Sequence, residues 1–513
     1  MRLERHTPVR TEGLAAAGLP VGSSLSGKGG AGTFSGHGSG AVGFALNHFG
    51  ASESDLQKTL SAALEKGGDY ADLFFEHTYS NSIGLQDGAV NRASSNIDFG
   101  MGVRVISGDR TGYAYVENIT PGDMLKAAQT AARIAADSCG RREPVNLTEM
   151  ASAHDLYAVR TAWDELAVKD KMPWLQQLND RIFALDNRVV KVIAGLGDTT
   201  SHIFFCNSAG EMFYDYRPMA RLHAQCIMAE GDRLENNYAG RSFRMGAEFL
   251  TDGLVNTLAS EAVDRTAILF RSVKPRGGEM PVVMGAGGSG ILLHEAIGHA
   301  FEADFNRKNI SIFSGKLNQA VCDRHINVVD DGTIPFNRGS VNIDDEGVAG
   351  QKTFIVRNGI LTSYLHDRIS AGHYGVAPTG NGRRESFRAT PVPRMRATYM
   401  EAGNYSEEEI IAAVKKGVYA SGFTNGQVQI GAGDFTFFVR NGYLIENGKL
   451  TQPVKDINII GNGPKALADI TMTGNNYRMD NGTWTCGKDG QSCPVTCGMP
   501  SALVSKLTVG GEN

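Results

Sequence analysis

Residues 281–307 combine a short apolar strand, a glycine loop and a helix with ionisable side chains: PVVMGAGGSGILLHEAIGHAFEADFNR. At 100° per residue, apolar side chains cover one broad face of this helix. Glu295, Gly298, His299 and Glu302 occupy the other face, with His294 at its edge. Burying two imidazoles and two carboxylates is costly unless a metal or specific hydrogen bonds satisfy them. This helix is therefore the first candidate for chemistry.

The two histidines form the pattern His294-Glu295-x-x-x-His299, one residue longer than the HExxH motif of zinc metallopeptidases. On a regular α-helix, a separation of five residues turns the side chains about 140° apart instead of about 40°, which makes a poor chelate. A π-helical turn brings residues i and i+5 together, and Gly298 permits such a distortion. From spacing alone, a metal-binding pair and a pair of structural histidines remain equal alternatives.

A third candidate ligand, Cys486, lies in TWTCGKDGQSCPVTCGMP. It follows a strand-like Trp-Thr pair and enters a glycine-rich turn, where a metal could hold a thiolate. Cys493 and Cys497 have a CxxxC spacing that could indicate a zinc knuckle, but no second cysteine or histidine pair accompanies them, so buried thiols are favoured. Among apolar neighbours, we predict core cysteines at Cys139, Cys206, Cys226 and Cys322.

The glycine loop before the helix gives an alternative function. Gly285 to Gly290 (GAGGSG) fits the GxGxxG pattern of dinucleotide-binding folds, and Asp304 follows about 20 residues on. The next residues, FEADFNRKNISIF, contain no second apolar strand ending in that acid, as a βαβ unit requires. We interpret the glycines as a closely packed turn, with a nucleotide-binding oxidoreductase as the alternative.

The first half of the chain mixes helices with alternating strands. A capped helix starts at Ser52, a second begins at Thr120-Pro121, and a third spans about Met172 to Leu185. Between them, alternating apolar runs separated by Asp-Gly and Gly-Asp turns predict antiparallel hairpins. We expect a Gly/Ser-rich flexible leader over residues 1–50 and an α+β domain over residues 51–273.

The composition shifts at the linker Lys274–Gly278, where we place the start of a C-terminal domain over residues 274–513. Two segments, TFIVRNGILTSYLHD and FTFFVRNGYLIENGKL, carry Asn-Gly between alternating apolar residues and predict hairpins. Ser406 and Glu409 form a capping box before a short helix. The predicted fold class is α+β with two domains, the second β-rich and carrying one metal-binding helix.

Composition excludes several classes of protein. The 513 residues hold 50 Lys and Arg against 55 Asp and Glu, with a net charge of −5, so the basic excess of a nucleic-acid-binding protein is missing. No apolar run approaches the roughly 20 residues of a membrane span, and the N-terminus lacks a secretory signal pattern. The 7 cysteines are sparse and odd in number, which suits a reducing compartment. We expect a cytoplasmic protein with no direct nucleic-acid or membrane partner.

Four separated motifs, in the right order, resemble the TldD branch of the TldD/PmbA (TldE) metallopeptidases: HEAIGHAFEADFNR, GVAPTGNGRRESF, PRMRATYM and TCGKDGQ. The resemblance runs from about Ser52 to the C-terminus. It implies that His294, His299 and Cys486 bind Zn²⁺ and that Glu295 acts in catalysis. It also implies proteolysis of unstructured peptides and a heterodimer with a TldE/PmbA-like partner that lacks the metal motif.

Zinc chemistry gives these residues roles. Three protein ligands leave a fourth position for water, and Glu295 would take its proton and return it to the leaving amine. Glu302 could orient His299, or it could be solvated or face a helix N-terminus. Arg383 and Arg384 could bind a substrate carboxylate or form structural ion pairs. An extended peptide would use an exposed sheet edge.

Overall fold

The computed structural model describes residues 40–136, 145–429, 431–480 and 482–511. Residues 1–39 of the predicted leader lie outside this range, but its last part is helical. Helix α1 (Ala41–Phe49) buries Val42, Ala45 and Phe49 in one of the cores. Sequence reasoning missed α1 because a helix this short is marginal alone and gains its stability from packing.

A seven-stranded sheet forms the N-terminal half, with the order β3-β2-β1-β5-β6-β4 and β7 paired to β6. Its pairings are antiparallel except for β4 with β6. Asp87 and Gly88, at the predicted turn between the first two strands, have φ values of 51° and 81°, as a type I′ turn requires. The strands are β1 (Tyr70–Gln86), β2 (Ala89–Ser107), β3 (Arg110–Val116), β4 (Thr148–Glu149), β5 (Val189–Asn207), β6 (Glu211–Glu230) and β7 (Arg233–Phe243).

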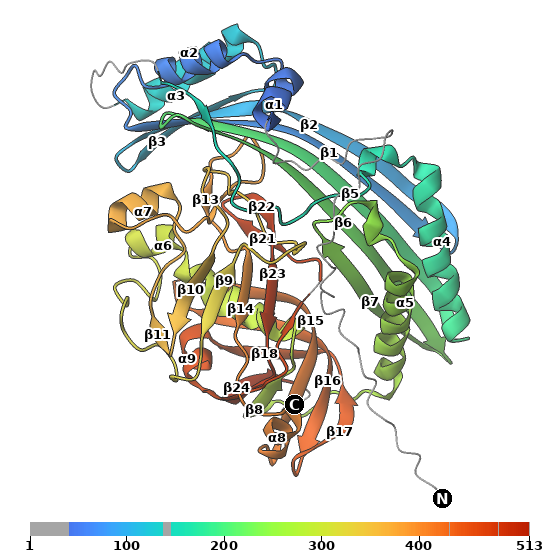
Figure 1. Ribbon diagram of the computed structural model, residues 1–513. Coiled ribbons are helices and arrows are strands. Elements are labelled where there is room, and N and C mark those ends of the chain that lie inside the picture. Colours follow the sequence, from blue (N-terminus) through green and yellow to red (C-terminus); the bar gives the residue numbers. More distant parts are fainter. Residues whose placement is uncertain (1–39, 137–144, 430, 481, 512–513) are drawn as a thin grey trace, which may run out of the picture. The chain divides into compact units, whose positions relative to one another are not determined.

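Four longer helices pack on this sheet. α2 (Glu53–Ala63) begins after the predicted cap Ser52, and α3 (Pro121–Ala135) after the cap Thr120. α4 (Val168–Leu185) and α5 (Asp252–Ala267) lie side by side against β5, β6 and β7 (Figure 1). Their apolar faces share one core with the strands. The α+β arrangement predicted for this half is confirmed.

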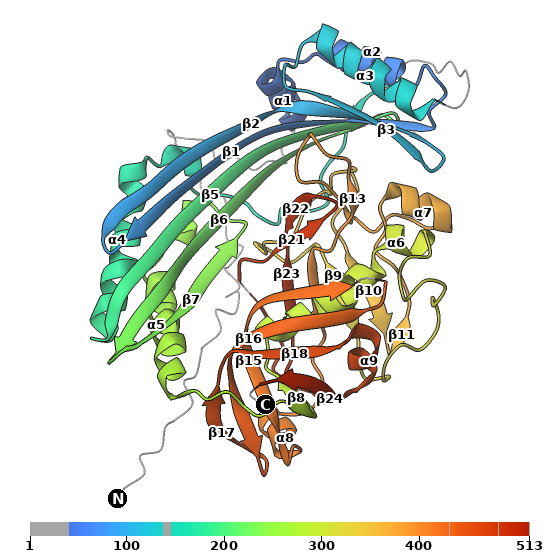
Figure 2. The ribbon, with the colours of Figure 1, turned by 180° about the vertical axis from the view of Figure 1, so that it is seen from behind.

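The C-terminal half contains a barrel of five strands. β15 (Lys416–Gln429), β8 (Gly278–Met284), β24 (Ala502–Gly510), β18 (Ile457–Asn462) and β16 (Asp434–Glu446) pair in that order, and β16 closes the ring by pairing with β15 (Figure 2). β17 (Lys449–Val454) extends β16, and β19 (Ile470–Thr473) pairs with β24. The β-rich character predicted for this half is confirmed.

The hairpin predicted for FTFFVRNGYLIENGKL is present as β16 and β17. Of its two Asn-Gly pairs, Asn447-Gly448 forms the turn, whereas Asn441-Gly442 lies inside β16. Gly442 is where β16 approaches β15 closely, because a Cβ there would lie 2.4 Å from the carbonyl oxygen of Tyr419. Glycine in a strand can mark a close backbone approach as well as a turn.

A second sheet lies beside the barrel and has the order β11-β10-β9-β14-β23-β20. Asn358-Gly359 joins β10 to β11, and Ser406 with Glu409 caps α8, both as predicted. The strands are β9 (Val328–Asp331), β10 (Lys352–Arg357), β11 (Ile360–Leu361), β14 (Ala397–Met400), β20 (Arg478–Met479) and β23 (Thr496–Met499). Two small ribbons add β12 (Gly382–Arg383) with β13 (Val392–Pro393) and β21 (Thr485–Lys488) with β22 (Gln491–Pro494).

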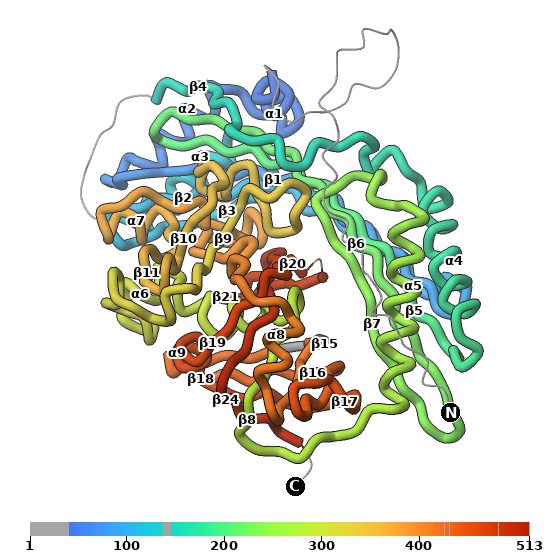
Figure 3. Tube along the Cα trace, turned by 60° about the horizontal axis from the view of Figure 1, so that its bottom comes forward, coloured from blue at the N-terminus to red at the C-terminus, as the bar shows by residue number. Residues whose placement is uncertain are grey.

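Short helices complete this half: α6 (Ala303–Arg307), α7 (Arg368–Tyr374), α8 (Glu407–Ala412) and α9 (Gly463–Ala468). The chain enters it from α5 through the linker, visible in Figure 3, and then forms β8. Between β8 and α6 lies the helical segment with both histidines, and its apolar side chains belong to the core of the barrel. No helix among the described residues is long and apolar enough to cross a membrane.

Candidate metal centre

The glycine loop after β8 is a packing device. A Cβ on Gly290 would lie 2.4 Å from the amide nitrogen of Gly498 in β23, so the loop lies directly on that strand. β8 is antiparallel to β24 and parallel to β15 within the barrel, which is not a βαβ unit. Asp304 lies in α6 and pairs with Lys488, their nearest atoms being 2.7 Å apart. The structural basis for the nucleotide-binding alternative is therefore missing.

The helix after this loop contains the π-helical turn that could bring the two histidines together. Residues Leu292–Gly298 are π-helical, and a short 3₁₀ turn, His299–Phe301, follows. His294 and His299 are both buried, with ring centroids 5.1 Å apart. A Cβ on Gly298 would lie 2.2 Å from the sulfur of Met395. Glycine is thus needed where the wide turn packs against the next layer.

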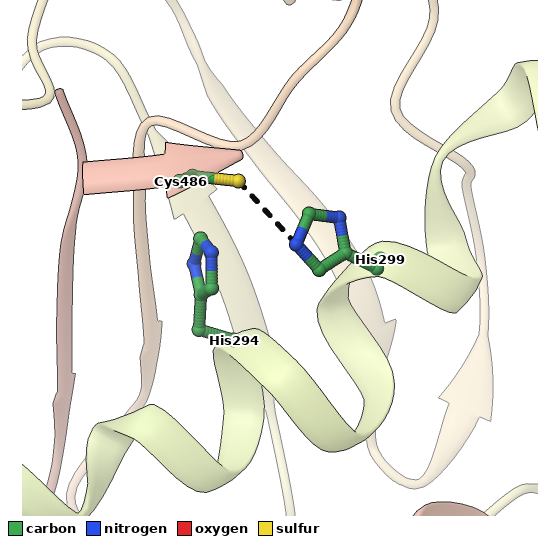
Figure 4. A group of neighbouring side chains, drawn as sticks. All are labelled: His294, His299 and Cys486. Atoms are coloured by element: carbon green, nitrogen blue, oxygen red, sulfur yellow. Dashed lines mark hydrogen bonds between the residues drawn. The ribbon is translucent and has the colours of Figure 1, made fainter. Parts of the chain in front are cut away.

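Strand β21 brings Cys486 to the two histidines from 187 residues further along the chain, as Figure 4 shows. Its Sγ lies 3.3 Å from Nε2 of His299. One ligand atom from each of Cys486, His294 and His299 lies within 4.8 Å of the others, and all three residues are buried. Imidazole nitrogens and thiolates are common donors to zinc, and three protein ligands leave one position of a tetrahedral site open.

The imidazole ring of His294 gives the strongest indication that these residues suit a metal ion. Both of its ring nitrogens are buried, and neither has a hydrogen-bond partner. Leaving such groups unpaired in the interior costs about 1–3 kcal/mol each. A cation held between the three side chains would bind one of these unpartnered nitrogens of His294.

The charges in the cluster favour a thiolate. Burial alone would raise the pKa of Cys486, but the two neighbouring imidazoles outweigh it and hold that pKa well below its usual range. Burial likewise disfavours a charged His299, but Glu302 and Cys486 raise its pKa well above the ordinary value. These charges favour a Cys486 thiolate beside a protonated His299. A divalent cation would take the place of that proton on His299.

Glu302 and Lys488 fix the orientation of His299. Nδ1 of His299 lies 2.9 Å from Oε2 of Glu302, which leaves Nε2 directed at Cys486. The Lys488 ammonium donates to the same carboxylate oxygen, to Asp304 and to the carbonyl of Pro393. Burial raises the pKa of Glu302, but Lys488 and His299 outweigh it and lower the pKa to about 2. Glu302 is therefore a charged partner of His299 and not a solvated group.

Sequence reasoning missed Lys488. Its signal was available, because Cys486 and Lys488 are two residues apart on one strand and so face the same side. Without the strand, nothing in the sequence placed a buried cation beside the metal helix.

Glu295, the predicted base, is half-buried, and no hydrogen bond of its carboxylate is found within the described part of the chain. Its Cγ lies 3.6 Å from the position that a Cβ on Gly426 in β15 would take. Its side chain is thus separate from the Glu302–Lys488 network and free to meet a ligand.

The other cysteines divide into three groups. Cys493 and Cys497 are buried in β22 and β23 and are not part of the three-ligand group, as the buried-thiol interpretation expected. Cys206 and Cys226 are in the core, but Cys322 is only half-buried. Cys139 lies outside the described residues.

Family models match the chain in three blocks. The PmbA/TldA metallopeptidase domain 1 matches residues 71–135, the central domain of the same family matches residues 162–270, and its C-terminal domain matches residues 277–511. The C-terminal block contains all of the residues of the candidate metal centre.

Relatives agree with the family models. A metalloprotease TldD homolog of Haemophilus influenzae is 39% identical over 450 residues, which cover 87% of this chain and 93% of the relative. A zinc metalloprotease TldD homolog of Saccharolobus solfataricus is 29% identical, over 88% of this chain and 99% of the relative. TldE from Thermococcus kodakarensis has the same fold, with a TM-score of 0.70 and 19% identity over 89% of this chain and 100% of that one.

Proposed function

Because this chain belongs to the PmbA/TldD metallopeptidase family and is a TldD-like metalloprotease, we propose that it is a zinc-dependent peptidase that hydrolyses unstructured peptides. In this proposal His294, His299 and Cys486 hold the zinc ion and Glu295 is the general base. The observation that carries it is the convergence of three ligand atoms within 4.8 Å around an imidazole with two unpartnered nitrogens.

Zinc supplies a Lewis acid that polarises a peptide carbonyl and makes a water easier to deprotonate. Cys486 and the two histidines hold the cation, and Glu302 keeps His299 in the tautomer that offers Nε2. The half-buried Glu295 accepts a proton from the attacking water and returns it to the leaving amine. The buried walls around the two histidines exclude bulk water from these transfers.

Metal analysis of the purified chain tests the ligand assignment. We expect one zinc per chain, and a marked loss of zinc when Cys486→Ser removes the thiolate. Cys493→Ser is the matched control, because Cys493 lies directly opposite Cys486 in the same ribbon and is equally buried. An unchanged zinc content in Cys486→Ser would exclude the thiolate ligand.

The base is tested by Glu295→Ala, for which we expect zinc to stay bound while peptide hydrolysis falls about 10²–10⁴-fold. Glu279→Ala is a suitable control, because Glu279 is a surface carboxylate in β8 that pairs with the exposed Lys506. Retained hydrolysis in Glu295→Ala would remove the assigned base.

The proposed partner is a TldE/PmbA-like subunit, and the proposed location is the cytoplasm. The shared fold of TldE from Thermococcus kodakarensis supports a paired assembly of similar chains. Unfolded peptides are the proposed substrates because a sheet edge binds an extended main chain without strict demands on sequence. Size-exclusion chromatography with and without the partner, followed by digestion of an unstructured and a folded substrate, tests these assignments.

A further inference from the structure

A cavity of about 300 Å³ lies between the long sheet and the C-terminal half of the chain, and none of the three candidate ligands lines it. Strands β1, β5 and β6 form one wall, and the ribbon β21–β22 contributes to the other. Its lining is rich in guanidinium groups: Arg217, Arg244, Arg338, Arg383 and Arg384.

Two of these arginines are neutralised by the protein. Arg217 pairs with Asp215 and Asp345, at 2.7 and 2.6 Å. Arg384 lies 3.6 Å from Asp72 and donates to the carbonyl of Asp345. They belong to a structural network, which is the second of the two interpretations that the sequence left open for Arg384.

The other three have no carboxylate within ion-pair distance among the described residues. Arg383 donates to the carbonyls of Met395 and Pro494. Arg338 donates to the carbonyl of Trp484 and to the hydroxyls of Ser242 and Thr485. Buried charges are normally paired, so these groups lack an anion.

Of these three arginines, Arg244 has the fewest partners. It is 5% exposed, its Nε has no partner, and its guanidinium lies over the Tyr157 ring at 5.3 Å. Burial lowers its pKa to about 10. Burial and three neighbouring guanidiniums, those of Arg221, Arg244 and Arg383, also lower the pKa of Arg338 to about 10. The arginines therefore repel one another across the cavity.

The lining favours a small monoanion. Arginine side chains bind carboxylates through paired hydrogen bonds, and the hydroxyls of Thr78 and Ser201 line the same cavity. Asp345 is already paired with Arg217, and the carboxyl groups of Glu76 and Glu385 also line the cavity. The positive excess of the three unpaired arginines is therefore small, and one carboxylate matches it better than a multiply charged anion. A volume near 300 Å³ is at the lower end of ligand pockets.

The cavity and the candidate metal centre lie on opposite faces of strand β21. Neighbouring residues of a strand face opposite sides, so Thr485 faces the cavity while Cys486 faces the histidines. Ser492 and Pro494 of β22 line the cavity as well. An anion bound here would therefore belong to a part of the ligand other than the bond being cleaved.

We propose that this cavity binds the C-terminal carboxylate of a peptide, with Arg244, Arg338 and Arg383 as its cationic partners. The inference rests on the proposed peptidase function, since every peptide substrate or product carries such a group. It adds a requirement for a free C-terminus to substrate recognition.

Peptide binding to the full-length Glu295→Gln protein tests this. Fluorescein-labelled tetra-alanine is compared as the free acid and as the C-terminal amide by fluorescence anisotropy. A charged hydrogen-bonded pair contributes about 1.5–3 kcal/mol, so the acid should bind at least about tenfold tighter. Arg244→Gln should abolish this preference, because Arg244 makes no side-chain hydrogen bond within the described chain that its loss would break. Arg388→Gln, on the exposed arginine that pairs with Asp98 and Glu117, should retain it.

Equal binding of acid and amide would overturn the proposal. So would an amide with an internal glutamate that binds as tightly as the acid, because the site would then take a side chain. Displacement by inorganic phosphate without any preference for the acid would also overturn it. If Arg244→Gln does not fold, Arg338→Lys takes its place. These measurements record binding, whereas the zinc and hydrolysis experiments record the proposed function, so the two can fail separately.

Discussion

Two buried polar clusters in the C-terminal half differ in how completely they satisfy their own atoms. Asp330 is fully buried and accepts hydrogen bonds from the backbone and side chain of Arg396, from Thr398 and from Asn381. The remaining donors of Arg396 reach backbone carbonyls. In the candidate metal centre, by contrast, neither nitrogen of the buried His294 has a hydrogen-bond partner among the described residues.

The difference separates groups that hold the fold from groups that await a ligand. Burial and charge are common to both clusters, so neither marks a functional site. An imidazole or guanidinium buried with no partner for any of its nitrogens is a better sign, because folding alone does not repay its desolvation. The arginine cavity resembles the candidate metal centre in this respect, since the Arg244 side chain has no hydrogen-bond or ion-pair partner among the described residues.

The cluster around Asp330 and Arg396 should be essential for stability, and its contribution to the free energy of unfolding should not depend on a bound metal. Asp330→Ala leaves Arg396 buried without its counter-ion, and breaking such a buried pair costs about 3–5 kcal/mol in the free energy of unfolding. Glu401→Ala is the control, because the partly exposed pair of Lys352 and Glu401 in the same region should contribute less than about 1 kcal/mol. Urea unfolding of both variants, with and without a chelator, measures this. If Asp330→Ala and Glu401→Ala lost the same free energy of unfolding, the Asp330 cluster would not be a group that holds the fold.

Glu76 gives an intermediate case, a buried carboxylate with neutral partners. It accepts from the Thr78 hydroxyl and the Phe387 amide, both at 2.7 Å, but no described residue offers it a cation within ion-pair distance. Burial raises its pKa from 4.5 to about 7. The neutral form is therefore favoured in the folded state, and its stabilising contribution is present below pH 4.5 and lost as the pH rises to about 7.

The raised pKa of Glu76 corresponds to a loss on the order of 3 kcal/mol in the free energy of unfolding as the pH rises from 4.5 to about 7. Glu76→Gln cannot ionise, so we expect its free energy of unfolding to fall less between pH 5 and pH 8 than that of the wild type. Denaturant midpoints at several pH values give the comparison. Parallel curves for the two proteins would mean that Glu76 is already charged in the folded state.

Local signals in the sequence predicted the elements that depend on neighbouring residues. The caps at Ser52, Thr120 and Ser406 lie where expected, and the π-helical turn that could bring the two histidines together is present. Each of these features is decided within one or two helical turns.

Features decided by distant parts of the chain were not predictable in this way. Asn441-Gly442 has the composition of a turn, but pairing with β15 keeps it in a strand. The approach of Cys486 to His299 spans 187 residues, and spacing left its role open until the family resemblance was considered. The partnership of Lys488 with Glu302 and Asp304 was missed because it exists only after β21 packs on the metal helix.

Glu302 belongs to both kinds of cluster, because Lys488 satisfies its charge while its carboxylate holds His299, one of the three candidate ligands. Glu302→Gln keeps the shape of the side chain but removes the charge that fixes His299. Loss of a group that orients a metal ligand costs about 10–100-fold in metal affinity, so we expect zinc to be lost at correspondingly higher free zinc concentrations. Competition with a zinc-binding dye measures it, and Asp304→Asn is the control, because Asp304 pairs with Lys488 but has no bond to His299. If both variants lost affinity equally, Lys488 and not Glu302 would be the group that positions His299. A fall confined to Glu302→Gln would assign that task to its carboxylate.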